Sequence, residues 1–155
     1  MKLILLRHGE SQWNLENRFT GWKDVGLTDS GKQEAKSAGK KIIESKIIID
    51  SVYTSLLKRA THTSNIVAKY INFNLENIQY DWRLNERHYG ALQGLNKSET
   101  AEKYGEEQVL IWRRSFDIPP PSLKNDDPRH PRFNSKFNNI KDNLPSGESL
   151  KDVIE

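Results

Sequence analysis

The sequence of 155 residues contains no cysteine. This absence excludes disulfide bonds, a thiolate nucleophile and a zinc site built on cysteine ligands, and it suits a reducing compartment such as the cytosol. No apolar run approaches the roughly 20 residues that cross a bilayer, and the apolar stretch at the N-terminus is too short for a signal peptide. The net charge of +3 is too small to indicate nucleic-acid binding, and clustered arginines would suit small anionic substrates equally well.

The first half of the chain alternates between short apolar runs typical of strands and segments whose apolar residues have helical spacing. With 35% hydrophobic and 29% charged residues it has the balance of a soluble globular protein, and we expect one domain over residues 1–155. A β-α-β-α-β order predicts a parallel sheet in a three-layer α/β domain. The predicted elements are a strand at Lys2–Arg7, a helix from Thr28 or Asp29 to about Ser45, a strand at Ile47–Thr54, a helix entered through Ser55–Arg59, and a strand at Ile78–Trp82.

The second half is rich in loops and short helices. Asn96, with Glu99 three residues later, predicts the start of a helix that runs to about Tyr104. Another helix is expected over 106–115, with the three prolines at 119–121 after it. Residues 122–143 are polar and predict a long surface excursion. A last helix is expected to begin near Gly147.

Arg7, His8 and Gly9 follow the first predicted strand, at the end where ligands of open α/β sheets collect. A neutral His8 can attack phosphorus through one ring nitrogen while the other donates to a backbone carbonyl. The planar fork of Arg7 suits phosphate oxygens, and backbone N–H groups around Gly9 could also approach a phosphate. The alternative is a buried structural histidine, but a cation beside it at a strand end requires an anion.

The Arg-His-Gly run resembles the hallmark of the histidine phosphatase superfamily. Further segments follow in family order, at residues 19–22, 54–60, 84–90, 92–97, 112–117 and 119–121. Together they resemble the 2,3-bisphosphoglycerate-dependent phosphoglycerate mutases over essentially the whole chain. The resemblance implies a three-layer α/β/α fold with a mostly parallel sheet, of which the C-terminal part is missing here.

The resemblance implies that 3-phosphoglycerate and 2-phosphoglycerate are interconverted in glycolysis and gluconeogenesis through a phosphohistidine. His8 would carry the phosphoryl group after priming by 2,3-bisphosphoglycerate, without a metal. Arg7 and Arg59 would share the phosphate site, and Glu86 would act as acid and base. The structural alternatives are a solvated helix-end cation for Arg59 and, for Glu86, a loop carboxylate paired with Arg83 or Arg87.

The resemblance also implies substrate-binding residues, a cellular location and an oligomeric state. Adjacent arginines on a helix point in different directions, so the residues alone predict one of Arg113 and Arg114 in the pocket and one in solvent. A cytoplasmic homo-dimer or homo-tetramer that binds small-molecule phosphoglycerates is expected, without nucleic-acid or membrane partners. The residues implied at the substrate are Arg7, His8, Gly9, Glu10, Ser11, Gln12, Trp13, Asn14, Thr20, Gly21, Arg59, Glu86, Arg87, His88, Tyr89, Lys97, Arg113 and Arg114.

The family's second catalytic histidine, in a Gly-His-Gly-Asn run, has no counterpart among the four histidines of this sequence. Of these, His62 and His130 are expected to be structural, and His88 is expected near the site without a chemical role. We therefore expect the front part of a longer protein, with impaired catalysis and stability if it stands alone. A histidine phosphatase that transfers the phosphoryl group to water, and a phosphate-binding fragment without turnover, are the alternative functions.

Overall fold

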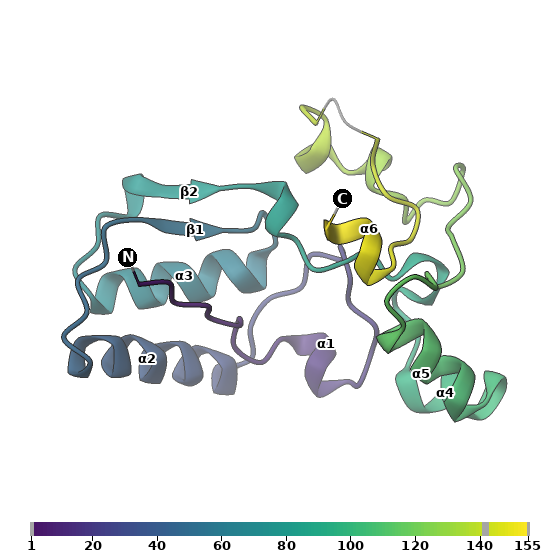
Figure 1. Ribbon diagram of the computed structural model, residues 1–155, viewed down its shortest axis with the longest axis horizontal. Helices are drawn as coiled ribbons and strands as arrows, with labels where there is room; N and C mark the ends of the chain where they lie inside the picture. Colours follow the sequence, from purple (N-terminus) through teal and green to yellow (C-terminus); the bar gives the residue numbers. More distant parts are fainter. Residues whose placement is uncertain (1, 141–142, 155) are drawn as a thin grey trace. The chain divides into compact units, whose positions relative to one another are not determined.

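A computed structural model describes residues 2–140 and 143–154. The chain forms two compact units (Figure 1). Unit 1 comprises Met1–Leu15 and Asp24–Leu84, and unit 2 comprises Glu16–Lys23 and Asn85–Glu155.

Unit 1 contains a parallel pair of strands and two long helices. The strands pair in the register Val52 with Ile78 and Thr54 with Tyr80, which confirms the predicted parallel arrangement. The strand predicted at Ile47–Thr54 begins only at Val52. One helix packs against the first strand and the other packs against that helix (Figure 1). The elements are α1 (Gln12–Leu15), α2 (Asp29–Glu44), β1 (Val52–Thr54), α3 (Lys58–Tyr70), η1 (Leu75–Asn77), β2 (Ile78–Tyr80) and η2 (Trp82–Leu84).

Helix α2 begins and packs as its sequence predicts. The Thr28 hydroxyl accepts a hydrogen bond from the N–H of Gly31, which satisfies one of the free donors of the first turn. A side chain at Gly39 would meet the Cβ of Tyr70 at 2.6 Å, so glycine lets α2 and α3 approach closely at this point. Burial of Ala35 on the same helix adds to the small core of unit 1.

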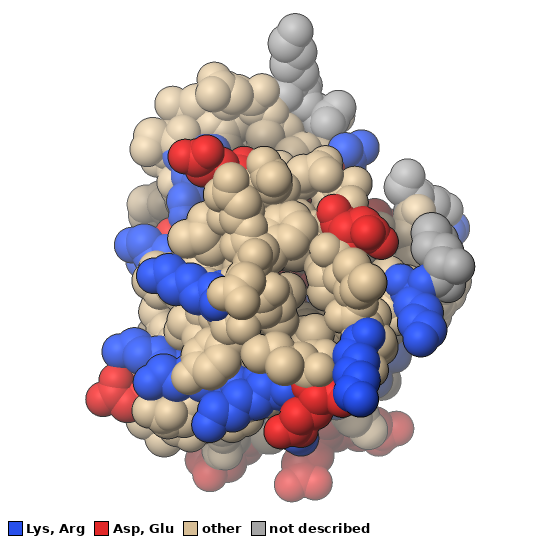
Figure 2. All heavy atoms as spheres, turned by 90° about the vertical axis from the view of Figure 1, so that its left-hand side faces the viewer, with Lys and Arg blue, Asp and Glu red and all other residues tan. Residues whose placement is uncertain are grey.

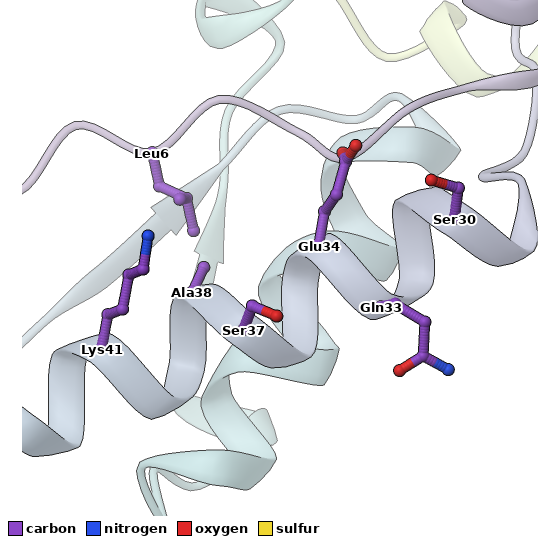
Figure 3. A pocket seen from close by; sticks show the side chains of 7 residues that line it. All are labelled: Leu6, Ser30, Gln33, Glu34, Ser37, Ala38 and Lys41. Atoms are coloured by element: carbon purple, nitrogen blue, oxygen red, sulfur yellow. The ribbon is translucent and has the colours of Figure 1, made fainter.

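The prediction of a strand at Lys2–Arg7 is wrong, because residues 2–10 form neither helix nor strand. A strand requires a neighbouring strand to which it is hydrogen-bonded, whereas an apolar sequence by itself favours only an extended backbone. Leu3 and Leu5 are 78% and 86% exposed. Leu6 points toward α2 across a groove whose other lining residues belong to that helix (Figure 3), namely Ser30, Gln33, Glu34, Ser37, Ala38 and Lys41.

Unit 2 is built from short helices around a small aromatic core. Phe19, Leu92 and Val109 are buried, and Tyr89 and Trp112 pack against them. The elements are η3 (Gly90–Leu92), α4 (Lys97–Tyr104), α5 (Glu106–Arg114), η4 (Pro131–Phe133), η5 (Ser135–Phe137) and α6 (Leu150–Ile154).

The helices of unit 2 confirm the predicted start signals. The side chain of Asn96 accepts from the N–H groups of Ser98 and Glu99 at the start of α4. Gly105 joins α4 to α5 with a φ of 86°, a conformation that glycine adopts without steric cost. The helix predicted after Gly147 is present as α6.

Residues 122–140 differ from the predicted surface excursion, because the segment is anchored in unit 2. Leu123, His130 and Phe137 are buried, and the ring of Phe137 lies 4.8 Å from that of Trp22. Single apolar anchors separated by polar residues give no periodic signal, which explains why the sequence suggested a solvated segment. Residues 141–142 of that prediction lie outside the described residues.

Charged side chains do not gather into one patch on the face shown in Figure 2. Lysines and arginines there are interspersed with acidic residues around an uncharged centre. In the described part of the chain, no helix combines the length and apolar character needed to cross a bilayer.

Candidate active site

The His8 side chain is held in one protonation pattern by two neighbours. Its Nδ1 lies 2.7 Å from the carbonyl oxygen of Gly9, which can only accept, so Nδ1 carries the proton. The Nε of Arg59, which can only donate, lies 3.2 Å from Nε2 of His8. The ring is therefore neutral, and its lone pair is on Nε2. This is the tautomer that a nucleophilic histidine needs.

Arg59 lies in the first turn of α3 and is fully buried, so the alternative of a solvated helix-end cation is wrong. The helix N-terminus adds partial positive charge beside the guanidinium. The sequence gives Leu57 at the N-cap, without a side-chain cap, and the N–H of Lys58 is satisfied instead by Asp24 at 2.6 Å. A buried guanidinium against an imidazole concentrates the positive field that attracts phosphate.

Gly9 serves close packing in this structure. A Cβ there would lie 2.2 Å from the carbonyl oxygen of Gly31, so the motif chain touches the first turn of α2 directly. Its N–H donates to the Thr63 hydroxyl at 3.1 Å, and that hydroxyl donates to the Arg59 carbonyl at 2.8 Å. The expected approach of the Gly9 N–H to a phosphate is therefore not supported, because this donor is bound to Thr63.

The residues that follow Gly9 are bonded among themselves. The N–H of Glu10 donates to Glu34 at 2.8 Å, and its carboxylate accepts from Thr28 at 2.7 Å. Ser11 is fully buried, and both its N–H and its hydroxyl donate to the side-chain oxygen of Asn14. These bonds fix the exit from the motif into α1.

The other predicted residues of unit 1 differ in exposure. Arg7 is exposed at the end of the extended segment. Gln12 and Trp13 lie in α1, where Gln12 is exposed and Trp13 is half-buried. Unit 1 thus brings His8 into direct side-chain contact with Arg59, and Ser11 into direct side-chain contact with Asn14.

In unit 2 the predicted substrate loop has a compact geometry. Gly21 has a φ of +51°, and its Cα lies against the Tyr89 backbone, since a Cβ would be 3.1 Å from that N atom. Thr20 is buried beside it. Lys97 begins α4, with its Nζ 6.0 Å from the centre of the Phe19 ring.

Glu86 is exposed in the segment that leads into the buried pair Arg87 and His88. Each of the two arginines considered as its structural partners also bonds another part of the chain. Arg83 forms an ion pair with Asp81, and it holds the pKa of that carboxyl at about 2 through its side-chain hydrogen bonds. The guanidinium of Arg87 donates to the carbonyls of Trp112 and Arg113 at 2.8 Å and of Glu148 at 3.1 Å.

His88 is a core histidine in this structure. It is fully buried, and burial, followed by the nearby charges of His130 and Arg129, lowers its pKa to about 4. Its Nδ1 accepts from the N–H of Gly90 at 2.9 Å, which stabilises the turn into η3. His130 is likewise buried, contrary to the surface segment predicted for it, and bonds Ser146, while His62 is exposed.

The last two residues of α5 are Arg113, which is half-buried, and Arg114, which is exposed. Two residues that bond the predicted site residues were not predicted from the sequence, namely Thr63 and Glu148. Thr63 could have been found, because its spacing of four from Arg59 places both on one helix face. Glu148, which accepts from the His88 N–H at 2.6 Å, has no local signal beyond its place in the turn at 147–149.

Residues 2–140 and 143–154 bring together no group of three or more His, Asp or Glu side chains suited to a metal ion. The metal-free reaction implied by the resemblance stays a prediction.

Comparison with known proteins gives a consistent family. Residues 3–150 match the histidine phosphatase superfamily (branch 1). The chain is 55% identical over 154 residues to a protein of Hydrogenobaculum sp. (strain Y04AAS1) and 57% identical over 155 residues to one of Bacteroides fragilis. Both are named 2,3-bisphosphoglycerate-dependent phosphoglycerate mutase. Each alignment covers 99% of this chain, but the chain spans 62% of the relative's length.

Solved structures support the same fold. A mycobacterial glucosyl-3-phosphoglycerate phosphatase complexed with VO3 matches 73% of this chain and 53% of its own, with a TM-score of 0.64 and 25% identity. Bacillus stearothermophilus YhfR matches 68% of this chain and 50% of its own, with a TM-score of 0.59 and 33% identity. The fold class is the predicted phosphoglycerate mutase-like α/β fold with a parallel sheet.

Proposed function

The chain belongs to the histidine phosphatase superfamily, and from that membership we propose that it takes part in the interconversion of 3-phosphoglycerate and 2-phosphoglycerate. The observation that carries the proposal is the pair formed by the Nε2 of a neutral His8 and the buried guanidinium of Arg59. Relatives with the mutase name at 55–57% identity favour this reaction over others of the superfamily.

His8 and Arg59 suit the phosphoryl-transfer step. The lone pair on Nε2 attacks phosphorus, the bond to the ester oxygen breaks, and the leaving alkoxide takes a proton from Glu86. In the reverse step a substrate hydroxyl gives its proton to Glu86 and attacks the phosphorus on His8. Arg59, and Arg7 at the end of the extended segment, would neutralise the charge that develops on the phosphoryl oxygens. The Gly9 carbonyl keeps the Nδ1 proton in place throughout.

The remaining assignments rest on the resemblance. Tyr89, Lys97, Arg113 and Arg114 would bind the carboxylate and phosphate of the substrate, and Thr20 and Gly21 would line the site. We further propose 2,3-bisphosphoglycerate as the primer, a cytoplasmic location, a homo-dimer or homo-tetramer, and no nucleic-acid or membrane partner. The buried cation beside His8 fits a phosphoryl group, which supports a phosphate ester as the primer.

A histidine phosphatase is the second candidate, because the solved structures of similar fold include a phosphatase. That likeness is at 25% identity, against 55–57% for the relatives with the mutase name, so the mutase is preferred.

Two product assays separate these candidates. With 3-phosphoglycerate and catalytic 2,3-bisphosphoglycerate, the mutase proposal predicts 2-phosphoglycerate. Phosphate release without isomerisation would refute it in favour of the phosphatase. Thermal stabilisation by the ligands without any product would point to a phosphate-binding fragment.

A further inference from the structure

Arg87 is placed where it can hold the end of a helix. Helices leave their last carbonyls without intrahelical donors, and those of Trp112 and Arg113 at the end of α5 each accept from the Nη2 of Arg87 at 2.8 Å. The side chain is 7% exposed, so water cannot replace these bonds. The Arg87 Cζ also lies 4.7 Å from the centre of the Tyr89 ring, a cation–π contact that adds to these bonds.

Glu148 connects the same loop to a third segment through its backbone and its carboxylate. Its carbonyl accepts from the Nη1 of Arg87 at 3.1 Å. Its carboxylate accepts from the His88 N–H at 2.6 Å, while its own N–H donates to the His88 carbonyl at 2.9 Å. Burial raises the pKa of this carboxyl, and the hydrogen bond from His88 opposes that rise.

These bonds bring three separate segments of unit 2 to one point. The loop that carries Glu86 and Tyr89, the end of α5 with its two arginines, and the turn at 147–149 all meet at Arg87 and Glu148. We propose that Arg87 and Glu148 are positioning residues that set the place of Arg113 and Arg114 for the substrate anion. This inference rests on the proposed function, and it replaces the direct substrate contact implied for Arg87.

The charge of Arg87 alone does not explain this arrangement. Its three acceptors are neutral carbonyls on two segments, so the forked shape of the guanidinium decides how many it can reach. Lysine at the same place would keep the charge but present one nitrogen. The proposal therefore predicts that Arg87→Lys loosens the end of α5 although no ionised group is lost.

Arg129, which also forms an ion pair with Asp127, provides a control in the same unit. Its guanidinium also donates to two backbone carbonyls, those of Ala91 at 3.2 Å and Gln93 at 2.9 Å, but neither lies on α5. Arg129→Lys should therefore lower thermal stability without a specific effect on the arginines of α5. Comparing the two substitutions separates positioning from a general loss of stability.

Amide hydrogen exchange and ligand affinity test the proposal together. In Arg87→Lys we expect the amide hydrogens of Ser115 and Glu148 to exchange about tenfold faster, as expected for a loss close to one hydrogen bond to a charged group. The amide of Gly105 at the end of α4 should be unchanged. The affinity for 3-phosphoglycerate should fall about tenfold, while that for inorganic phosphate, which needs only the His8 and Arg59 pair, stays within about twofold.

Variants of Glu148 show whether its carboxylate oxygen or its charge matters. Glu148→Gln keeps an acceptor for the His88 N–H and should retain the wild-type affinity for 3-phosphoglycerate, whereas Glu148→Ala should resemble Arg87→Lys. Equal effects of Arg87→Lys and Arg129→Lys on exchange and affinity would overturn the proposal. If the wild-type chain binds inorganic phosphate but not 3-phosphoglycerate, the proposed function fails, and the exchange data still decide whether Arg87 holds the end of α5.

Discussion

In unit 1 the candidate catalytic groups contact each other, whereas in unit 2 the candidate groups are arranged by bonds to the backbone. Arg59 donates directly to the ring of His8, so the chemistry and the packing share one contact. Arg87 donates to carbonyls of α5 and of Glu148. By our proposal it thereby positions Arg113 and Arg114, which would bind the substrate, without binding the substrate itself. We therefore expect substitution of Arg59 to change the candidate chemistry directly, and substitution of Arg87 to change it through the geometry of α5.

The largest expected effect comes from a substitution that disrupts the close contact between Gly9 and Gly31 in unit 1. Gly9→Ala would place a methyl group 2.2 Å from the Gly31 carbonyl oxygen, and we expect a loss of about 3 kcal/mol or more in the free energy of unfolding. Urea unfolding measures it. Gly26→Ala is the control, because no atom lies within 4 Å of the Cβ that it adds. A Gly9→Ala protein as stable as this control would show that the close contact is not real.

Removing Arg59 should break the chemistry of unit 1 more than its fold. In Arg59→Ala we expect the affinity for inorganic phosphate to fall by about 100-fold, since a buried, charge-assisted donor is lost. Arg59→Lys should recover only part of it, because one ammonium cannot replace the fork. Titration calorimetry gives both affinities. Unchanged binding in Arg59→Ala would remove this residue from the phosphate site.

His88 should make the stability of unit 2 depend on pH between about 4 and 6.5. Its pKa is about 4 in the folded chain against 6.5 in the unfolded chain, so the unfolded state binds more protons between these values. Stability from this source is complete above pH 6.5 and falls as the pH drops toward 4, by about 3 kcal/mol.

His88→Asn provides the comparison for that pH dependence. Its side-chain oxygen can still accept from Gly90, and it does not titrate. Urea unfolding from pH 4 to pH 7 should show the extra loss in the wild type alone. Glu148, whose raised pKa acts in the opposite direction, is present in both proteins and cancels in the difference. Parallel pH profiles would contradict the buried neutral histidine.

The sequence predicted what local chemistry determines. The caps at Thr28 and Asn96 and the order of helices follow from side chains that bond their own neighbours. The motif itself suggested Arg7 as the cation beside His8, whereas the observed partner is Arg59, which only the family resemblance implied. It did not predict that Gly9 packs on Gly31 or that Arg87 reaches carbonyls of α5, because both contacts join segments remote in sequence.

The same limit explains the errors in the predicted fold. An apolar run at residues 3–6 predicts an extended chain, but whether it becomes a strand depends on a neighbour that local sequence does not specify. Phe137 and His130 anchor a segment of polar composition through isolated burial, for which there is no periodic pattern to detect.

The smallest expected effect is the loss of the Asn96 cap at the start of α4, the helix that begins with Lys97. Asn96→Ala removes the acceptor for the N–H groups of Ser98 and Glu99, and it should cost about 1 kcal/mol of stability. Asn96→Asp keeps an acceptor oxygen and should be close to wild type. Thermal unfolding of the two variants tests it. Equal loss in both would show that the amide group, rather than its oxygen, is needed.

The central claim is that the Nε2 of His8, oriented by Arg59 and the Gly9 carbonyl, accepts a phosphoryl group. Intact-mass spectrometry at neutral pH, after incubation with 2,3-bisphosphoglycerate, tests it most directly. The account predicts the added mass of one phosphoryl group, its loss in acid, and no addition in His8→Ala. Addition that persists in His8→Ala, or no addition to a folded wild-type chain that binds phosphate, would contradict it.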